Sequence, residues 1–235
     1  MTDLISLIDL TSLNTVDNSS TTSKLITMAN IGFKGLYAAS VCVYPKFAKQ
    51  IKANLHPKIK SCSVCSYFPT SQAPIELKLQ EIEFLDTIGV DEIDIVLPIG
   101  DFLAGNYNAV SNELLAIRKK TDKDLKLIIE TCMLKTPDLV EKATILGINA
   151  DMNFIKTSTG KAEFGADMNS TIVMAKTIKS NGGKTGLKIA GGIKTRQDAM
   201  LYINSISQIL GEKYINPSTF RIGASNLYNQ LIEDK

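Results

Sequence analysis

The chain has 235 residues, of which 44% are hydrophobic and 21% charged, and its 26 Lys and Arg residues nearly balance its 24 Asp and Glu residues. This composition excludes a disordered chain, and the lack of a basic stripe argues against a nucleic-acid binder. No apolar run approaches the roughly 18 residues that a membrane span needs. The N-terminus has an early acid, Asp3, and no basic region, which argues against a signal peptide.

Short apolar segments recur along the whole chain. Most of them are near-continuous apolar runs, which is typical of parallel strands that are buried on both faces. The predicted strands cover, in chain order, residues 5–10, 35–41, 59–65, 92–97, 126–130, 152–156, 186–190 and 219–223.

Amphipathic helical patterns separate these strands. A helix that starts at Ile75 is expected to stop at Gly89, and Thr136 and Pro137 form a cap and first turn for a helix that runs to Gly147. Thr195 and Asp198 match a capping box. The other predicted helices cover residues 19–31, 46–54, 107–120, 169–180 and 225–233.

Eight strand–helix units in a chain of this length predict a closed (β/α)8 TIM barrel that forms a single domain over residues 1–235. The alternative is an open, doubly wound sheet. Such sheets usually carry G-x-G-x-x-G after the first strand, and in this chain no two glycines are separated by a single residue. We therefore favour the barrel.

Charged side chains stand within the apolar strands near their C-terminal ends, where barrel enzymes have their active sites. They are Asp9, Asp94, Lys156 and Lys188. Two lysines on neighbouring strands would disfavour each other's charge, so the pKa of at least one should fall. A neutral amine is the nucleophile that attacks a carbonyl carbon, and Asp94 could act as its acid–base partner. The pattern predicts a Schiff-base site.

Glycine-bearing turns follow the last three strands. These turns offer backbone N–H groups, hydroxyl groups or a helix N-terminus to an anion, and barrel phosphate sites are commonly made by the loops after strands seven and eight. The sequence therefore predicts an anion site at Gly160, Lys161, Gly191, Gly192, Gly223 and Ser225.

The cysteines and the single histidine do not indicate a metal site. Cys62 and Cys65 form a C-x-x-C motif without a second such pair, and we interpret both as small buried side chains of a strand. His56 precedes the third strand and should lie at the opposite end of the barrel from the active site. A Ser–His or Cys–His nucleophile is therefore not expected.

Several of these segments resemble the 2-deoxyribose-5-phosphate aldolase family, which are Schiff-base aldolases on TIM barrels. The most specific are Phe154-Ile-Lys-Thr-Ser-Thr-Gly160 and Lys188-Ile-Ala-Gly-Gly192. The matching segments run in order over nearly the whole chain, at residues 8–14, 41–47, 91–98, 128–132, 151–161, 188–195 and 220–225. One departure is Lys194, which stands where an Arg often follows the Gly-Gly turn.

The resemblance implies reversible cleavage of 2-deoxy-D-ribose 5-phosphate to D-glyceraldehyde 3-phosphate and acetaldehyde. Lys156 matches the Schiff-base lysine, Asp94 and Lys188 match the proton-transfer pair, and Asp9 matches an acid near Lys188. The six residues of the anion site match positions around the phosphate. No metal or organic cofactor is implied, and we expect a cytoplasmic homo-oligomer, with a dimer as its form.

Two alternatives stay open at this point. One is another Schiff-base barrel enzyme, such as a transaldolase or a different sugar-phosphate aldolase. The other is a catalytically silent sugar-phosphate sensor, although binding alone does not require a buried pair of amines.

Overall fold

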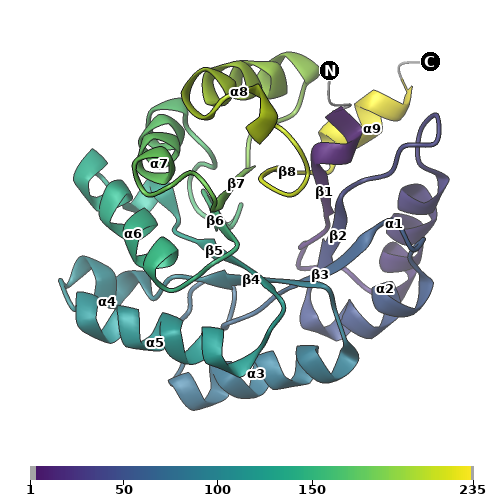
Figure 1. The fold of residues 1–235 in the computed structure, drawn as a ribbon. Coiled ribbons are helices and arrows are strands. Elements are labelled where there is room, and N and C mark those ends of the chain that lie inside the picture. The colour runs from purple at the N-terminus through teal and green to yellow at the C-terminus, as the bar shows by residue number, and fades with distance from the viewer. Residues whose placement is uncertain (1–3, 234–235) are drawn as a thin grey trace.

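The computed structural model describes residues 4–233, and its eight parallel strands pair in chain order and close into a barrel (Figure 1). The predicted (β/α)8 architecture is therefore confirmed. The strands are β1 (Ile8–Thr11), β2 (Ser40–Val43), β3 (Lys60–Val64), β4 (Glu92–Val96), β5 (Asp124–Ile128), β6 (Phe154–Lys156), β7 (Gly186–Ala190) and β8 (Phe220–Ala224).

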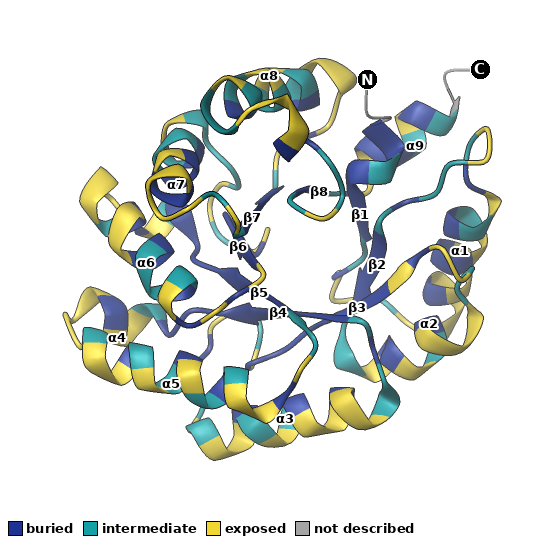
Figure 2. Ribbon diagram, in the orientation of Figure 1, coloured by how far each residue is buried: buried dark blue, intermediate teal, exposed yellow. Residues whose placement is uncertain are grey.

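The helices surround the barrel and turn their exposed residues outward, while the strands are buried (Figure 2). The α-helices are α1 (Ser19–Ile31), α2 (Ala48–Asn54), α3 (Ile75–Ile88), α4 (Ile99–Leu103), α5 (Tyr107–Lys120), α6 (Pro137–Asn149), α7 (Met168–Ser180), α8 (Arg196–Leu210) and α9 (Asn226–Glu233). Short 3-10 helices are η1 (Leu4–Leu7), η2 (Pro45–Phe47), η3 (Thr131–Met133) and η4 (Glu212–Tyr214). Within residues 4–233, no helix combines the length and the apolar character that crossing a membrane requires.

Local capping signals fix several helix ends as predicted. The Thr195 side chain accepts a hydrogen bond from the Asp198 backbone, and Asp198 returns the bond, which completes a capping box at α8. Gly89 ends α3 in the left-handed conformation, with φ of 78°. Thr136 caps α6 through the Leu139 backbone N–H.

Several predicted strand boundaries were wrong by two to five residues. Residues 4–7 form a 3-10 turn rather than the start of β1. The segment from residue 35 begins with Gly35 at φ of 79° and a small bridge between Phe33 and Leu36, so β2 begins only at Ser40. Glu130 has φ of 50°, which ends β5 before the predicted position. The helix α4 was missed, because its five residues are too few to show a helical period.

Gly147 does not end α6, contrary to the sequence prediction. The helix continues to Asn149, and a Cβ atom at Gly147 would lie 2.4 Å from the Ile155 side chain of β6. The missing side chain lets this helix pack closely on the barrel. Glycine is therefore needed at this position for the packing of α6 against β6, and it does not mark the end of the helix that the sequence pattern suggested.

A second glycine makes a close contact inside the barrel, and its substitution should destabilise the fold. A Cβ atom at Gly186 of β7 would lie 2.4 Å from two ring atoms of the buried Phe154. We expect Gly186→Ala to lower the free energy of unfolding by about 1–3 kcal/mol, as overpacked cores generally do. The measurement is urea unfolding of the purified protein.

Gly100→Ala is the matched control, because the nearest atom to an added Cβ there lies 4.0 Å away, in the Gln72 side chain. We expect Gly100→Ala to leave the stability unchanged or to raise it slightly, since Gly100 lies in a helix. Equal effects of the two substitutions would show that the Phe154 ring moves aside without penalty.

Candidate active site

The carboxylate of Asp94, on β4, lies at the centre of a group of charged side chains inside the barrel. Its Oδ2 atom accepts hydrogen bonds from Lys156 Nζ and from Lys188 Nζ, both at 2.8 Å. Lys156 and Lys188 are register partners on the adjacent strands β6 and β7, as the sequence predicted. All three side chains are at most 2% exposed.

A third lysine, Lys126 on β5, belongs to the same group and was missed by the sequence analysis. Its ammonium group lies 2.9 Å from Asp94 Oδ1 and 2.6 Å from Glu92 Oε2. The signal was present, because Lys126 is flanked by Leu125 and Leu127 in an apolar strand, as Lys188 is flanked by Leu187 and Ile189. A charge in such a setting requires a partner.

Two carboxylates besides that of Asp94, those of Asp9 and Glu92, extend the group toward the N-terminal end of the barrel. Asp9 on β1 lies 2.6 Å from Lys188 Nζ, so the predicted proximity of this acid to the second lysine is present. Arg221 on β8 joins Asp9 to Glu92 through contacts of 2.6 Å and 2.9 Å. The sequence analysis gave Arg221 no role, because the three arginines of the chain are scattered along it.

These side chains form what we term the charge cluster: Asp9, Glu92, Asp94, Lys126, Lys156, Lys188 and Arg221. With ordinary charges it contains four cations and three carboxylates, and each member is almost completely buried. An uncompensated buried charge is strongly unfavourable. The buried cations thus outnumber the buried carboxylates by one, and the partly exposed Lys60, which also pairs with Asp124, contacts Glu92 as well.

Lys156 has the fewest ion pairs of the three lysines in the charge cluster. Among the described residues, Lys156 contacts one carboxylate, Asp94, whereas Lys188 contacts two and Lys126 contacts three. The single carboxylate of Lys156 is moreover shared with both other lysines. Lys156 is therefore the lysine that the carboxylates of the charge cluster hold least.

The pKa shifts follow from these contacts. Burial alone would raise the pKa of Asp94, but the three ammonium groups outweigh burial and hold this pKa well below its usual range. Burial would lower the pKa of Lys188, but the carboxylates of Asp9 and Asp94 raise it above its ordinary value. The sequence predicted a lowered pKa for at least one of the two adjacent lysines, and Lys188 is not that lysine, because two acids that the sequence does not place beside it contact it.

A cavity of about 170 Å³ opens over the charge cluster at the C-terminal ends of the strands. Of the three lysines in the charge cluster, only Lys156 lines it within the part of the chain that the structure describes. Five of the six residues of the predicted anion site also line it: Gly160, Lys161, Gly191, Gly223 and Ser225. Gly192 follows Gly191 in the same turn but does not line the cavity.

The turns around this cavity depend on close backbone contacts. Gly160 and Gly191 have φ of 75° and 83°, which favours glycine at both positions. A Cβ atom at Gly165, a residue that the sequence analysis did not select, would lie 2.4 Å from backbone atoms of Gly191. The buried carboxylate of Glu130 accepts hydrogen bonds from the backbone and hydroxyl groups of Thr159, and so holds the loop before Gly160.

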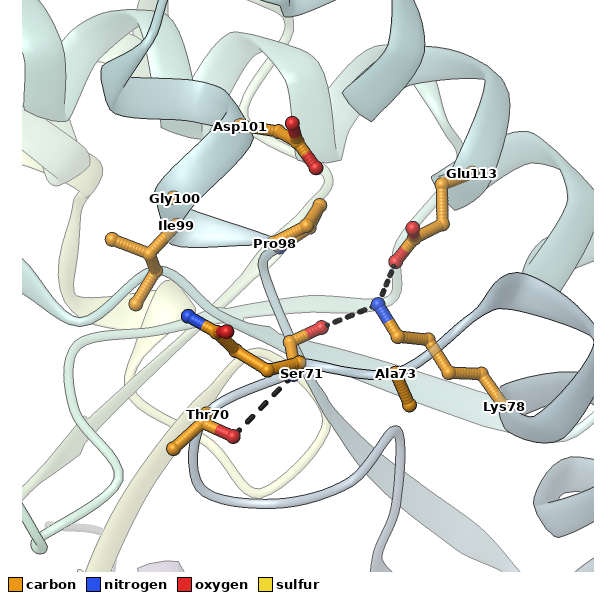
Figure 3. Close-up of a pocket in the computed structure, with 10 residues that line it drawn as sticks. Thr70, Ser71, Ala73, Lys78, Pro98, Ile99, Gly100, Asp101 and Glu113 are labelled. Carbon is orange, nitrogen blue, oxygen red and sulfur yellow. Dashed lines mark hydrogen bonds and ion pairs between the residues drawn. The ribbon is translucent and has the colours of Figure 1, made fainter.

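A second cavity, of about 290 Å³, lies between the loops that follow β3 and β4 (Figure 3). It contains a buried lysine, Lys78, whose ammonium group lies 2.6 Å from Glu113 Oε1 and 2.9 Å from Ser71 Oγ. The charge of Lys78 is thus already compensated, unlike that of the charge cluster. We interpret this ion pair as structural.

The single histidine takes no part in the charge cluster. His56 precedes β3, and its ring stacks on the Tyr37 ring with the centroids 4.3 Å apart. The sequence expectation that His56 lies away from the site is confirmed.

Comparison with known proteins gives one consistent family. The model of the DeoC/LacD family aldolases matches residues 4–208. The deoxyribose-phosphate aldolase of Agrobacterium fabrum is 34% identical, over 97% of this chain and 88% of its own length. The deoxyribose-phosphate aldolase of Homo sapiens is also 34% identical, over 97% of this chain and 78% of its own length.

Solved structures agree with this result. The structure described as a unique tetrameric structure of deoxyribose phosphate aldolase from Aeropyrum pernix has a TM-score of 0.79 and 25% identity to this chain. The match covers 98% of this chain and 89% of that one.

Proposed function

Because the chain belongs to the DeoC/LacD family of aldolases, we propose that it reversibly cleaves 2-deoxy-D-ribose 5-phosphate to D-glyceraldehyde 3-phosphate and acetaldehyde through a Schiff base. The observation that carries the proposal is the position of Lys156. Its amine lines the cavity, while its one carboxylate partner is shared with two other lysines. A lysine so placed can become neutral and attack the aldehyde of the open-chain sugar.

The first part of the reaction transfers the Lys156 proton and forms the imine. Asp94 Oδ2, at 2.8 Å, is the nearest acceptor for that proton. Loss of the Lys156 charge removes one of the three cations that lower the pKa of Asp94, and this favours the transfer of the proton to Asp94. The amine adds to C1 of the sugar, and protonated Asp94 gives its proton to the hydroxyl group formed there. That group leaves as water, which yields a protonated imine and restores the Asp94 carboxylate.

The second part breaks the C2–C3 bond. Asp94, directly or through a water molecule, removes the proton of the C3 hydroxyl group, and the bonding electrons move into the imine. D-glyceraldehyde 3-phosphate leaves, and the remaining enamine takes up a proton at C2. Hydrolysis of the imine then releases acetaldehyde and regenerates Lys156.

The other members of the charge cluster hold this pair in position. Lys188 contacts both Asp9 and Asp94, and we propose that it remains an ammonium group that relays protons to Asp94. Asp9 fixes Lys188 and is in turn held by Arg221. Lys126 orients the other oxygen of Asp94.

We place the substrate phosphate at the turns with Gly160, Gly191, Gly223 and Ser225, next to Lys161. Backbone N–H groups at glycine turns and the N-terminus of α9 provide hydrogen-bond donors and a favourable dipole for an anion. If so, unphosphorylated 2-deoxyribose should be a poorer substrate by about 100-fold or more in kcat/KM, since each hydrogen bond to a charged group contributes about 1.5–3 kcal/mol.

The test compares the two sugars on the wild-type protein and on Gly165→Ala, with a chelator present and with both products identified. The added Cβ would press on the Gly191 backbone, so the preference for the phosphorylated sugar should shrink through a higher KM. Gly100→Ala serves as the control outside this cavity. Equal efficiency on both sugars in the wild type would remove the phosphate from these turns, and products other than acetaldehyde and D-glyceraldehyde 3-phosphate would indicate a different aldolase.

We also propose that the chain acts as a cytoplasmic homo-oligomer, with a dimer as the simplest form. The proposal rests on the family, in which the Aeropyrum pernix enzyme is described as tetrameric.

A further inference from the structure

Two cysteines face each other inside the barrel, next to Asp94. Cys42 on β2 and Cys62 on β3 are register partners on adjacent strands. Their two sulfur atoms and a carboxylate oxygen of Asp94 all lie within 4.8 Å of one another. The Cys62 thiol donates a hydrogen bond of 3.2 Å to Asp94 Oδ1. The proposed mechanism assigns neither thiol a role.

The apparent C-x-x-C motif is not the pair that matters. Cys62 lies within β3, whereas Cys65 follows Val64, the last residue of that strand. Cys65 Sγ lies 3.5 Å from Glu81 of α3, outside the barrel, whereas Cys62 Sγ points to Asp94 inside it. The partner of Cys62 is therefore Cys42, which lies 20 residues earlier in the sequence.

We propose that Cys42 and Cys62 form a reversible disulfide in the presence of hydrogen peroxide, and that this bond lowers the activity of the neighbouring site. Adjacent strands lie about 4.8 Å apart, and disulfides join Cα atoms that are about 4.4–6.8 Å apart. The register of β2 and β3 thus places the two cysteines within the span of a disulfide.

The reaction balances with peroxide as the oxidant. The Cys42 thiolate attacks one peroxide oxygen, the O–O bond breaks, and a sulfenic acid and hydroxide form. The Cys62 sulfur then attacks the sulfenic sulfur, the S–O bond breaks, and the second oxygen leaves as water. In total, two thiols and one hydrogen peroxide give one disulfide and two water molecules.

The two thiols differ in a way that suits these roles. The neighbouring Cys62 side chain lowers the pKa of Cys42, and the ammonium groups of Lys188 and Lys156 act in the same direction, whereas burial and the Asp94 carboxylate raise it. Burial raises the pKa of Cys62. The Cys62 thiol is also held by its hydrogen bond to Asp94, so we assign the attack on peroxide to Cys42 and the resolving step to Cys62.

Peroxide can approach from the side of the cavity. Leu13 packs in one cluster with Cys42, Cys62 and Val64, and Leu13 also lines the cavity over the charge cluster. The cluster that contains the two thiols therefore borders the space that substrate is proposed to enter.

Thiolate and carboxylate ligands at this spacing could also attract a thiophilic metal ion, but the surroundings oppose it. The charge cluster already contains four cations, and Asp94 is shared among three of them. A divalent ion would compete with these lysines for the carboxylate. Disulfide formation adds no charge to the barrel, so the structure favours oxidation over metal binding.

The disulfide should act on catalysis through Asp94. Oxidation removes the S–H donor from Asp94 Oδ1 and leaves sulfur lone pairs against the carboxylate. Loss of a hydrogen bond to a charged group typically changes a rate by about tenfold or more. We therefore expect turnover to fall by about tenfold or more after oxidation.

The experiment treats the purified wild-type protein with hydrogen peroxide, and measures turnover together with intact and peptide mass. We expect a loss of two hydrogens in mass, a disulfide-linked peptide pair containing Cys42 and Cys62, and recovery of both mass and turnover with dithiothreitol. Peroxide treatment should leave the turnover of Cys42→Ala and of Cys62→Ala unchanged, because neither variant can form the disulfide. Cys132→Ala, which removes a thiol outside the barrel, should respond as the wild type does.

The mass readout is independent of the proposed reaction, so it tests the disulfide even if the substrate is a different one. Peroxide treatment that leaves the mass of the wild type unchanged, or that links Cys62 to Cys65, would overturn the proposal. So would inactivation that a chelator reverses and dithiothreitol does not, which would assign the pair to a metal ion.

Discussion

Lys156→Met should abolish cleavage of 2-deoxy-D-ribose 5-phosphate, with a fall in turnover on the order of 10⁴-fold or more, the scale on which loss of a covalent nucleophile acts. No other group of the charge cluster replaces it, because Lys126 and Lys188 keep two or more carboxylate contacts and do not line the cavity. The substitution leaves three cations against three carboxylates, so the protein should stay folded.

Borohydride trapping provides the direct readout for Lys156. Borohydride added with substrate should inactivate the wild type and attach a stable adduct to the peptide that contains Lys156. Lys161→Met is the matched control, because Lys161 lines the same cavity without belonging to the charge cluster, and it should still form the adduct. An adduct on Lys188 or Lys161 in the wild type would reverse the assignment.

Asp94→Asn should lower turnover by about 10²–10⁴-fold, the usual contribution of general acid–base catalysis. The amide keeps the shape of the side chain and removes the proton acceptor at 2.8 Å from Lys156 and Lys188. Imine formation should persist, because Lys156 still lines the cavity and water can take its proton in place of Asp94. The measurement is borohydride trapping beside turnover on the same protein.

Asp91→Asn is the matched control for this substitution, because Asp91 immediately precedes β4 and contacts Lys52 and Ser61 instead of the charge cluster. It should leave both readouts unchanged. Loss of trapping together with turnover in a folded Asp94→Asn protein would mean that Asp94 assembles the lysine pair. Near-normal turnover would transfer the proton-transfer role to Asp9 or to water.

Much of the fold was predictable because its signals are local. The apolar runs of the strands, the exposed face of each helix and helix caps such as Thr195 can each be recognised within a few residues. The helices and strands of the structure agree with these local patterns. Gly147 is an exception. Its sequence context resembles the end of a helix, but glycine is needed there because the side chain of Ile155, from a later strand, packs against its Cα atom.

The candidate site also has a part that the sequence predicts and a part that only the structure shows. The sequence by itself determined that Lys156 and Lys188 stand on neighbouring strands and that glycine turns follow them, since strand order in a barrel follows chain order. Only the tertiary structure placed Lys126 and Arg221 in the charge cluster and paired Cys42 with Cys62. The physical reason is that contacts inside a closed barrel depend on the register of its strands and on the way in which its long side chains fill the interior. The pattern of residues along one strand does not show which side chains of other strands will contact it.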